Sequence, residues 1–160
     1  MGKSLFVTLL LFLTLPLPAI GDPVSPLAKG QYIYLPMYSH ISQGSMDRKR
    51  VPDKALLSAL ISIRNTDEEH PIRVTSARYF DTNGRLVKEF FPSPQVVPPF
   101  GTTELFIAND DASGGSGANF AIAWHAGAPV SPPIIEAVHS MTGSRPFAFI
   151  TTGRTLRSFD

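Results

Sequence analysis

Apolar and polar residues alternate along most of the chain after residue 30. The alternation is clearest at residues 55–65 and 118–126, where apolar side chains recur at every second position. This period is typical of strands with one buried face, and Pro and Gly interrupt the chain too often for a long helix. The pattern predicts strands at residues 31–38, 55–65, 72–80, 85–91, 102–108, 118–126, 133–140 and 147–156.

Short strands separated by regular turn signals are typical of a sandwich or a barrel. We therefore expect an all-β fold with little helix: a two-sheet, immunoglobulin-like β-sandwich of seven to nine short antiparallel strands. Trp124 is expected at its centre, and residues 43–54 are mostly polar and are predicted to form a loop. Pro36 lacks the backbone donor of a sheet ladder, so the first strand is expected to lie at a sheet edge or to end there.

The N-terminal residues have the pattern of a targeting segment. Lys3 precedes an apolar run at residues 5–15, and small residues lead to a cleavage position after Gly21. The run is too short for a membrane-spanning helix, which needs about 20 apolar residues. We expect a signal peptide at residues 1–21, an extended arm at 22–30 and one domain at 31–160. This organisation predicts a location in the periplasm or outside the cell, with retention of the segment as a membrane anchor as the alternative.

Charge and cysteine content narrow the possible functions. Without Lys3, the 14 basic residues become 13 against 13 acidic residues, so the processed chain is formally neutral and lacks the basic excess that nucleic-acid binding needs. The absence of cysteine excludes disulfides, thiolate metal sites and a cysteine nucleophile. The basic cluster of Arg48, Lys49, Arg50 and Lys54 is interpreted as a solvated loop, with contact to an anionic surface as the alternative.

Four segments carry a resemblance to a known family. They are YLPMYSHI at residues 34–41, SIRNTD at 62–67, YFDTNGRLVKEF at 79–90 and SGGSGANFAIAW at 113–124. Together they resemble a bacterial family of secreted proteins that is described as a domain of unknown function. The resemblance extends over residues 32–154 and implies a single envelope-side domain, without assigning any catalytic or binding residue.

The glycine-rich segment at residues 109–117 is the most conspicuous loop. It lacks the lysine of a phosphate-binding loop, the helix of a nucleophile elbow and the alternating carboxylates of a calcium loop. We interpret it as a structural turn, with weak ion binding at Asp110, Asp111 and Ser116 as the alternative.

No catalytic constellation or metal motif is apparent, and we expect no cofactor and no enzyme activity. Ser116 with Asp111 and either His125 or His139 is the one hydrolase arrangement available, and nothing local supports it. The turn at residues 65–71 offers a weak site of Asp67, Glu68 and His70, where a carboxylate–imidazole metal site is the alternative to a solvated turn.

Tyr32, Tyr34 and Tyr38 alternate with apolar residues, so their rings are expected to face outward together. Tyrosine is common at interfaces, and an edge strand invites an added strand. We therefore expect a non-enzymatic interaction or accessory module that docks an envelope protein or polymer through these tyrosines. The alternatives are that the tyrosines are covered by the chain itself, and that the domain binds a small ligand or a metal ion.

Overall fold

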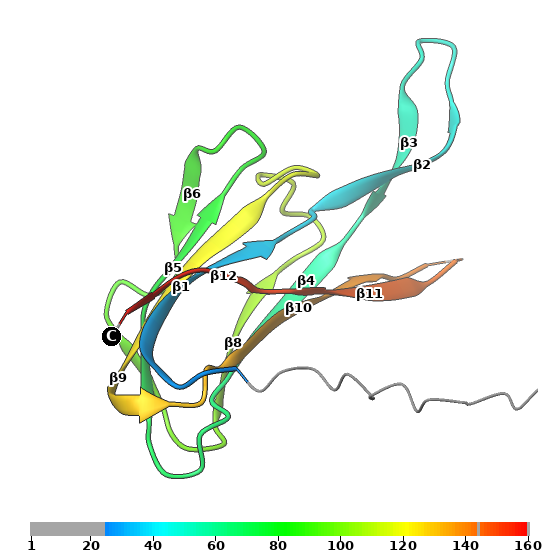
Figure 1. Ribbon diagram of the computed structural model, residues 1–160. Coiled ribbons are helices and arrows are strands. Elements are labelled where there is room, and N and C mark those ends of the chain that lie inside the picture. The colour runs from blue at the N-terminus through cyan, green and yellow to red at the C-terminus, as the bar shows by residue number, and fades with distance from the viewer. Residues whose placement is uncertain (1–24, 144, 160) are drawn as a thin grey trace, which may run out of the picture.

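The computed structural model describes residues 25–143 and 145–159 (Figure 1). This part of the chain forms twelve strands and no helix. The strands are β1 (Ala28–Pro36), β2 (His40–Met46), β3 (Pro52–Leu56), β4 (Ser58–Arg64), β5 (Ile72–Phe80), β6 (Leu86–Glu89), β7 (Gln95–Val97), β8 (Thr102–Ile107), β9 (Asn119–Val130), β10 (Ile134–Met141), β11 (Phe147–Thr152) and β12 (Arg154–Phe159).

Two antiparallel sheets pack face to face. One has the order β12-β1-β9-β5-β6, with β7 also pairing with β5, and the other has the order β11-β10-β4-β8. The expected all-β sandwich is confirmed. The strand count exceeds the expected seven to nine because β2, β3 and β7 form in segments that the pattern left as loops and because one expected strand is divided.

The core lies between the two sheets, and the alternation explains which side chains fill it. Phe120, Ile122 and Trp124 of β9 are fully buried, as the sequence predicts. Tyr79 of β5 stacks on Phe120 with ring centroids 5.0 Å apart. Ile61 of the opposite sheet is also fully buried, so the apolar faces of both sheets close one common core.

Strand β1 ends at Pro36, but it is not an edge strand. It pairs with β9 on one side and with β12 on the other, in a register that places Tyr34 opposite Arg154. Of the two alternatives, an end at Pro36 is confirmed and an open edge is wrong, because the last described strand occupies that edge. The strand also begins at Ala28, so the end of the segment expected to be an arm at residues 22–30 belongs to the sheet. The signal-peptide residues lie outside the described part.

Gly153 divides the segment that was expected to be one strand at residues 147–156. Before it, β11 pairs with β10, and after it, β12 pairs with β1 of the other sheet. A Cβ atom at Gly153 would lie 2.8 Å from Cγ2 of Ile33 and 3.1 Å from the carbonyl oxygen of Ile135. The chain can therefore pass between the two sheets only because this position carries no side chain.

The segment at residues 43–54 is the other clear difference. Instead of a loop it forms the β2–β3 hairpin, a separate two-stranded sheet that projects beyond the sandwich (Figure 1). No described helix is long and apolar enough to span a bilayer.

Candidate functional site

Tyr32 and Tyr34 lie on the outer face of the six-stranded sheet, as the alternation predicts. Arg78 donates a hydrogen bond of 2.9 Å to the Tyr32 hydroxyl, and the Arg157 guanidinium lies 5.1 Å from the centroid of the Tyr32 ring. Tyr34 is 37% exposed and is paired across strands with Arg154. Two tyrosines and three arginines therefore form one aromatic and basic surface.

Tyr38 does not belong to that surface, so the expectation that all three tyrosines face outward together is wrong. It follows the end of β1, and its ring packs edge-on against His139 and Phe149 with centroid distances of 5.7 Å. Strand β1 ends at Pro36, so Tyr38 lies beyond the paired strand and packs against the four-stranded sheet. The backbone N–H of Tyr38 donates to Nε2 of His139 at 3.2 Å, which ties the end of β1 to the four-stranded sheet.

His139 makes the stability of the domain depend on pH. Its side chain is fully buried and stacks on Phe149, and burial lowers the pKa of the imidazole. The folded state therefore holds a neutral ring, whereas the unfolded state gains a proton near pH 6.5. Stability should be complete above pH 6.5 and should fall as the pH drops towards the lowered pKa, by at most about 1.4 kcal/mol per pH unit.

Urea unfolding between pH 7.5 and pH 5 tests this expectation. His139→Gln keeps an oxygen that can accept the Tyr38 N–H and removes the titration, so the slope of stability against pH should become flatter. His40→Gln is the matched control, because His40 is only partly buried. An unchanged slope in His139→Gln would contradict the role of this imidazole.

The turn at residues 65–71 is built by the buried side chain of Asn65 and the partly buried side chain of Asp67. The Asn65 amide donates to the carbonyl oxygens of His70, Val97 and Pro98 at 2.9, 3.2 and 3.0 Å. The Asp67 carboxylate accepts backbone N–H bonds from Glu69, His70 and Ser131.

The Glu69 and His70 N–H groups are the main cause of a lowered pKa at Asp67, which lies at about 2. The imidazole of His70 also contacts the Asp67 carboxylate, at 3.2 Å. Asp67 is therefore a structural residue of the turn, whereas Glu68 and Glu69 are exposed at its apex and His70 is exposed beside them.

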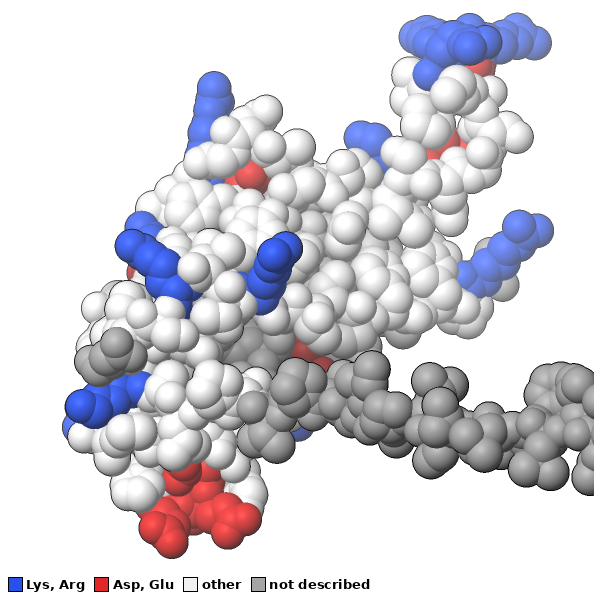
Figure 2. Space-filling model, in the orientation of Figure 1, with Lys and Arg blue, Asp and Glu red and all other residues white. Residues whose placement is uncertain are grey.

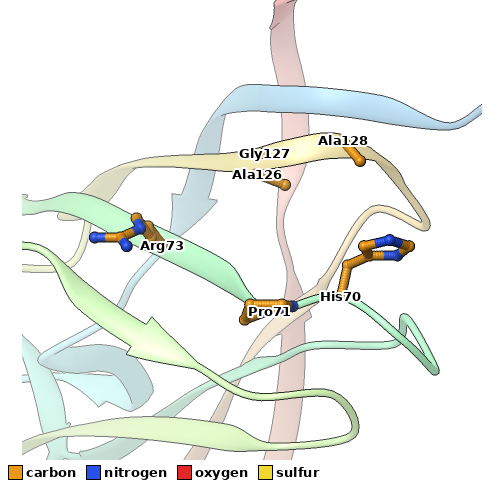
Figure 3. Close-up of a pocket in the computed structure, with 6 residues that line it drawn as sticks. All are labelled: His70, Pro71, Arg73, Ala126, Gly127 and Ala128. Carbon is orange, nitrogen blue, oxygen red and sulfur yellow. The ribbon is translucent and has the colours of Figure 1, made fainter.

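Two surface hollows meet at His70. The first has a volume of about 400 Å³ and is lined by His70, Pro71, Arg73, Ala126, Gly127 and Ala128. In Figure 3 the imidazole of His70 and the guanidinium of Arg73 lie at opposite ends of this hollow, with the small residues of β9 between them. The second hollow, of about 370 Å³, has Leu27, Glu68, Glu69 and Pro129 among its lining residues. The described residues contain no group of three His, Asp or Glu side chains arranged to hold a metal ion.

The glycine-rich loop at residues 109–117 is a packing element. Gly115 has a φ of 79°, and the carbonyl oxygen of Gly114 accepts a bond of 2.8 Å from the backbone of Thr82. The Asp111 carboxylate accepts bonds from the N–H and hydroxyl of Ser113, as the interpretation as a structural turn requires.

The remaining candidates of this loop do not assemble into a catalytic site. Asp110 and Ser116 are exposed, and His125 stacks on Phe159 with centroids 5.0 Å apart. His125 lies six strand positions beyond Asn119, about 20 Å along β9, and His139 is buried in the opposite sheet. Ser116 is therefore not brought to either histidine.

A surface that the sequence interpretation missed lies on the outer face of the four-stranded sheet. Four apolar residues occupy one register position across the four strands, and we call them the apolar row: Ile150, Val138, Leu60 and Phe106. Phe106 is 61% exposed and Ile150 is 59% exposed. One signal was present in the sequence, because Leu60 stands at a position where the alternation of β4 expects a polar residue. The row itself becomes visible only when the strand register is known.

The fold and its surfaces define an all-β sandwich domain with two exposed sheet faces. The profile of the family described as "Protein of unknown function (DUF3124)" matches residues 30–156, so the chain belongs to that family. This agrees with the resemblance to a domain of unknown function seen in the sequence. No protein with a curated description is detectably similar. The chain is similar to the solved structure of Thermotoga maritima 1070, at 11% identity over 81% of this chain and 97% of that chain, with a TM-score of 0.43.

Proposed function

We propose that this domain is a non-enzymatic docking module of the bacterial envelope, which binds another envelope protein or polymer through the apolar row. The observation that carries the proposal is the alignment of Ile150, Val138, Leu60 and Phe106 in one row across all four strands on the outer face of one sheet. Proteins that work alone rarely expose a continuous apolar patch, and protein interfaces have such a patch at their centre.

The chemistry of the row favours a protein partner with an apolar surface. Full burial of an exposed Phe or Ile side chain contributes about 1.5–3 kcal/mol. Around the row, Arg64 and Glu136 form an ion pair of 3.3 Å, and Glu104 is exposed on the neighbouring strand, so a polar rim surrounds the apolar centre. An apolar centre with a polar rim is the usual organisation of a protein interface.

The opposite face offers a second contact of different character. Tyr34 beside Arg154, and Tyr32 beneath Arg157, present aromatic rings and positive charge, which suit an acidic polymer or protein segment. We retain these tyrosines as a partner surface that does not involve strand addition, because β12 already occupies the edge of β1.

A location in the periplasm or outside the cell is part of the proposal. It is supported by the pattern of Lys3, the apolar run at residues 5–15 and the small residues up to Gly21. The absence of cysteine is compatible with an envelope protein that needs no disulfide.

Binding of a small ligand is the second candidate function. It is favoured by the hollow that is lined by His70, Arg73 and small residues of β9. A ligand bound there should raise the melting temperature of the protein, and Arg73→Ala should remove that shift.

Affinity capture from envelope extract, compared across variants, tests the docking function. Phe106→Ser with Ile150→Ser should lose the captured partner, because the centre of the interface becomes polar. The fold should persist, since both side chains are exposed. Leu86→Ser is the matched control, because it changes an exposed apolar residue on β6 of the other sheet. A partner retained by the row variant but lost with Tyr34→Ala and Arg154→Ala would contradict docking through the row.

A further inference from the structure

The β2–β3 hairpin forms an arm whose outer part is exposed on both faces. Residues 42–51, including the tip, are exposed, as are Asp53 and Lys54 beyond them. An isolated two-stranded ribbon is at best marginally stable in water, because it has no core to cover. An arm of this kind is expected to contact another surface.

The tip of the arm is an ordered turn. The Asp47 carboxylate accepts backbone N–H bonds from Lys49 and Val51 at 2.8 and 2.9 Å. Arg50 has a φ of 65°, a conformation that disfavours most side chains other than glycine and asparagine. A large cation therefore stands where the turn alone would favour a small residue, which points to a use for its charge.

The tip presents both positive charge and apolar area. Arg48, Lys49 and Arg50 are exposed, and within the described residues none of them forms an ion pair. On either side of them, Met46 is 61% exposed and Val51 is 49% exposed. The surface that complements this tip must combine negative charge with some apolar area.

The opposite end of the molecule has negative charge beside a mostly polar hollow to which two apolar residues contribute. Figure 2 shows Lys and Arg gathered at the tip of the arm, and Asp and Glu gathered at the far end. The turn between β4 and β5 lies at this end (Figure 1), and in it Glu68 and Glu69 are exposed, with no ion-pair partner among the described residues. Beside them lies the hollow of about 370 Å³, whose lining includes Leu27 and Pro129.

We propose that the arm of one copy docks onto the acidic end of a second copy. Arg48, Lys49 and Arg50 would then face Glu68 and Glu69, and Met46 or Val51 would enter the adjacent hollow. The two ends lie on opposite sides of one molecule, so a single copy cannot join them. The contact is heterologous and therefore adds copies head to tail. This inference goes beyond the proposed function, because the association leaves both sheet faces free.

Two variants, each of which removes the charges from one side of the contact, test the two sides independently. The tip variant is Arg48→Ser, Lys49→Ser and Arg50→Asn, in which asparagine tolerates the positive φ. The end variant is Glu68→Gln with Glu69→Gln. In sedimentation at low salt, the average mass of the wild type should rise about twofold or more with concentration, while each variant should stay monomeric.

The decisive measurement is the mixture of the two variants. The tip variant keeps an intact acidic end and the end variant keeps an intact arm, so an equimolar mixture should give a dimer that grows no further. Association of the wild type should fall at about 0.5 M salt, where exposed charges are screened. Arg85→Gln is the matched control, since it removes an exposed cation from the β5–β6 turn, and it should associate like the wild type.

Two results would overturn the proposal: a wild type that stays monomeric at every concentration, and a pair of variants that fail to combine. If the monomeric wild type binds vesicles containing phosphatidylglycerol while the tip variant does not, the arm is assigned to an anionic membrane surface instead. None of these results depends on the apolar row, so the docking function is tested separately.

Discussion

Replacing Gly114 with alanine is expected to destabilise the domain by about 3 kcal/mol, the upper part of the range for an overpacked site. A Cβ atom there would lie 1.9 Å from the hydroxyl oxygen of Tyr79, 2.5 Å from its Cζ and 2.7 Å from the Cβ of Ala118. Tyr79 cannot retreat, because it is almost fully buried and stacked on Phe120.

Urea denaturation, followed by the fluorescence of the single tryptophan, measures this effect directly. Gly127→Ala is the matched control, because a Cβ atom at Gly127 would meet no atom within 4 Å. That variant should unfold within about 0.5 kcal/mol of the wild type. If Gly114→Ala were equally harmless, the glycine-rich loop would not pack against Tyr79 as described.

Replacing Asn65 with aspartate should have an equal or larger effect, about 3–5 kcal/mol. The two side chains have nearly the same shape, but the change turns a donor that serves three carbonyl oxygens into an acceptor. Asn65 is buried, so water cannot replace the lost hydrogen bonds. The new carboxylate would also stand two residues from the ionised carboxylate of Asp67.

The same unfolding measurement at two pH values tests the cause of this effect. Destabilisation should be smaller at pH 4 than at pH 7, because protonation of the new carboxyl group relieves the repulsion. Asn109→Asp is the matched control, since Asn109 is exposed in the loop after β8 and its change should cost little. Equal losses of stability in the two variants would mean that the clamp by Asn65 is not needed.

The alternation of apolar residues predicts most of the sandwich, because burial of one face determines those strands. The expected strand at residues 72–80 is β5, and that at 102–108 is β8 apart from its last residue. The alternation does not predict the β2–β3 arm, because its side chains are mostly exposed and its turn depends on hydrogen bonds to Asp47. The alternation does not predict the break at Gly153 either. The chain passes from one sheet to the other there, and this leaves the local pattern of apolar and polar residues unaltered.

Predicting the candidate surfaces is harder, because they depend on which strands become neighbours. The sequence places Tyr32 and Tyr34 on one face correctly, since both lie inside a regular strand. It cannot show that β12 covers the edge of β1, or that Arg78 and Arg157 engage Tyr32. Phe106 and Ile150 become one surface only when β8, β4, β10 and β11 are in register.

The pairing of β1 with β12 has a consequence for how the chain reaches its fold. The two strands are the first and last of the described domain, and the side-chain bond between Gln31 and Ser158 spans 127 positions. Closing so long a loop lowers the chain entropy before the favourable contacts between its ends can form. Folds dominated by such contacts therefore form slowly, in milliseconds to seconds. Each of the two large sheets combines strands from both halves of the sequence, so neither half contains one of them complete. Folding is therefore expected to be cooperative, and the pairing of β1 with β12 is expected to form late in it.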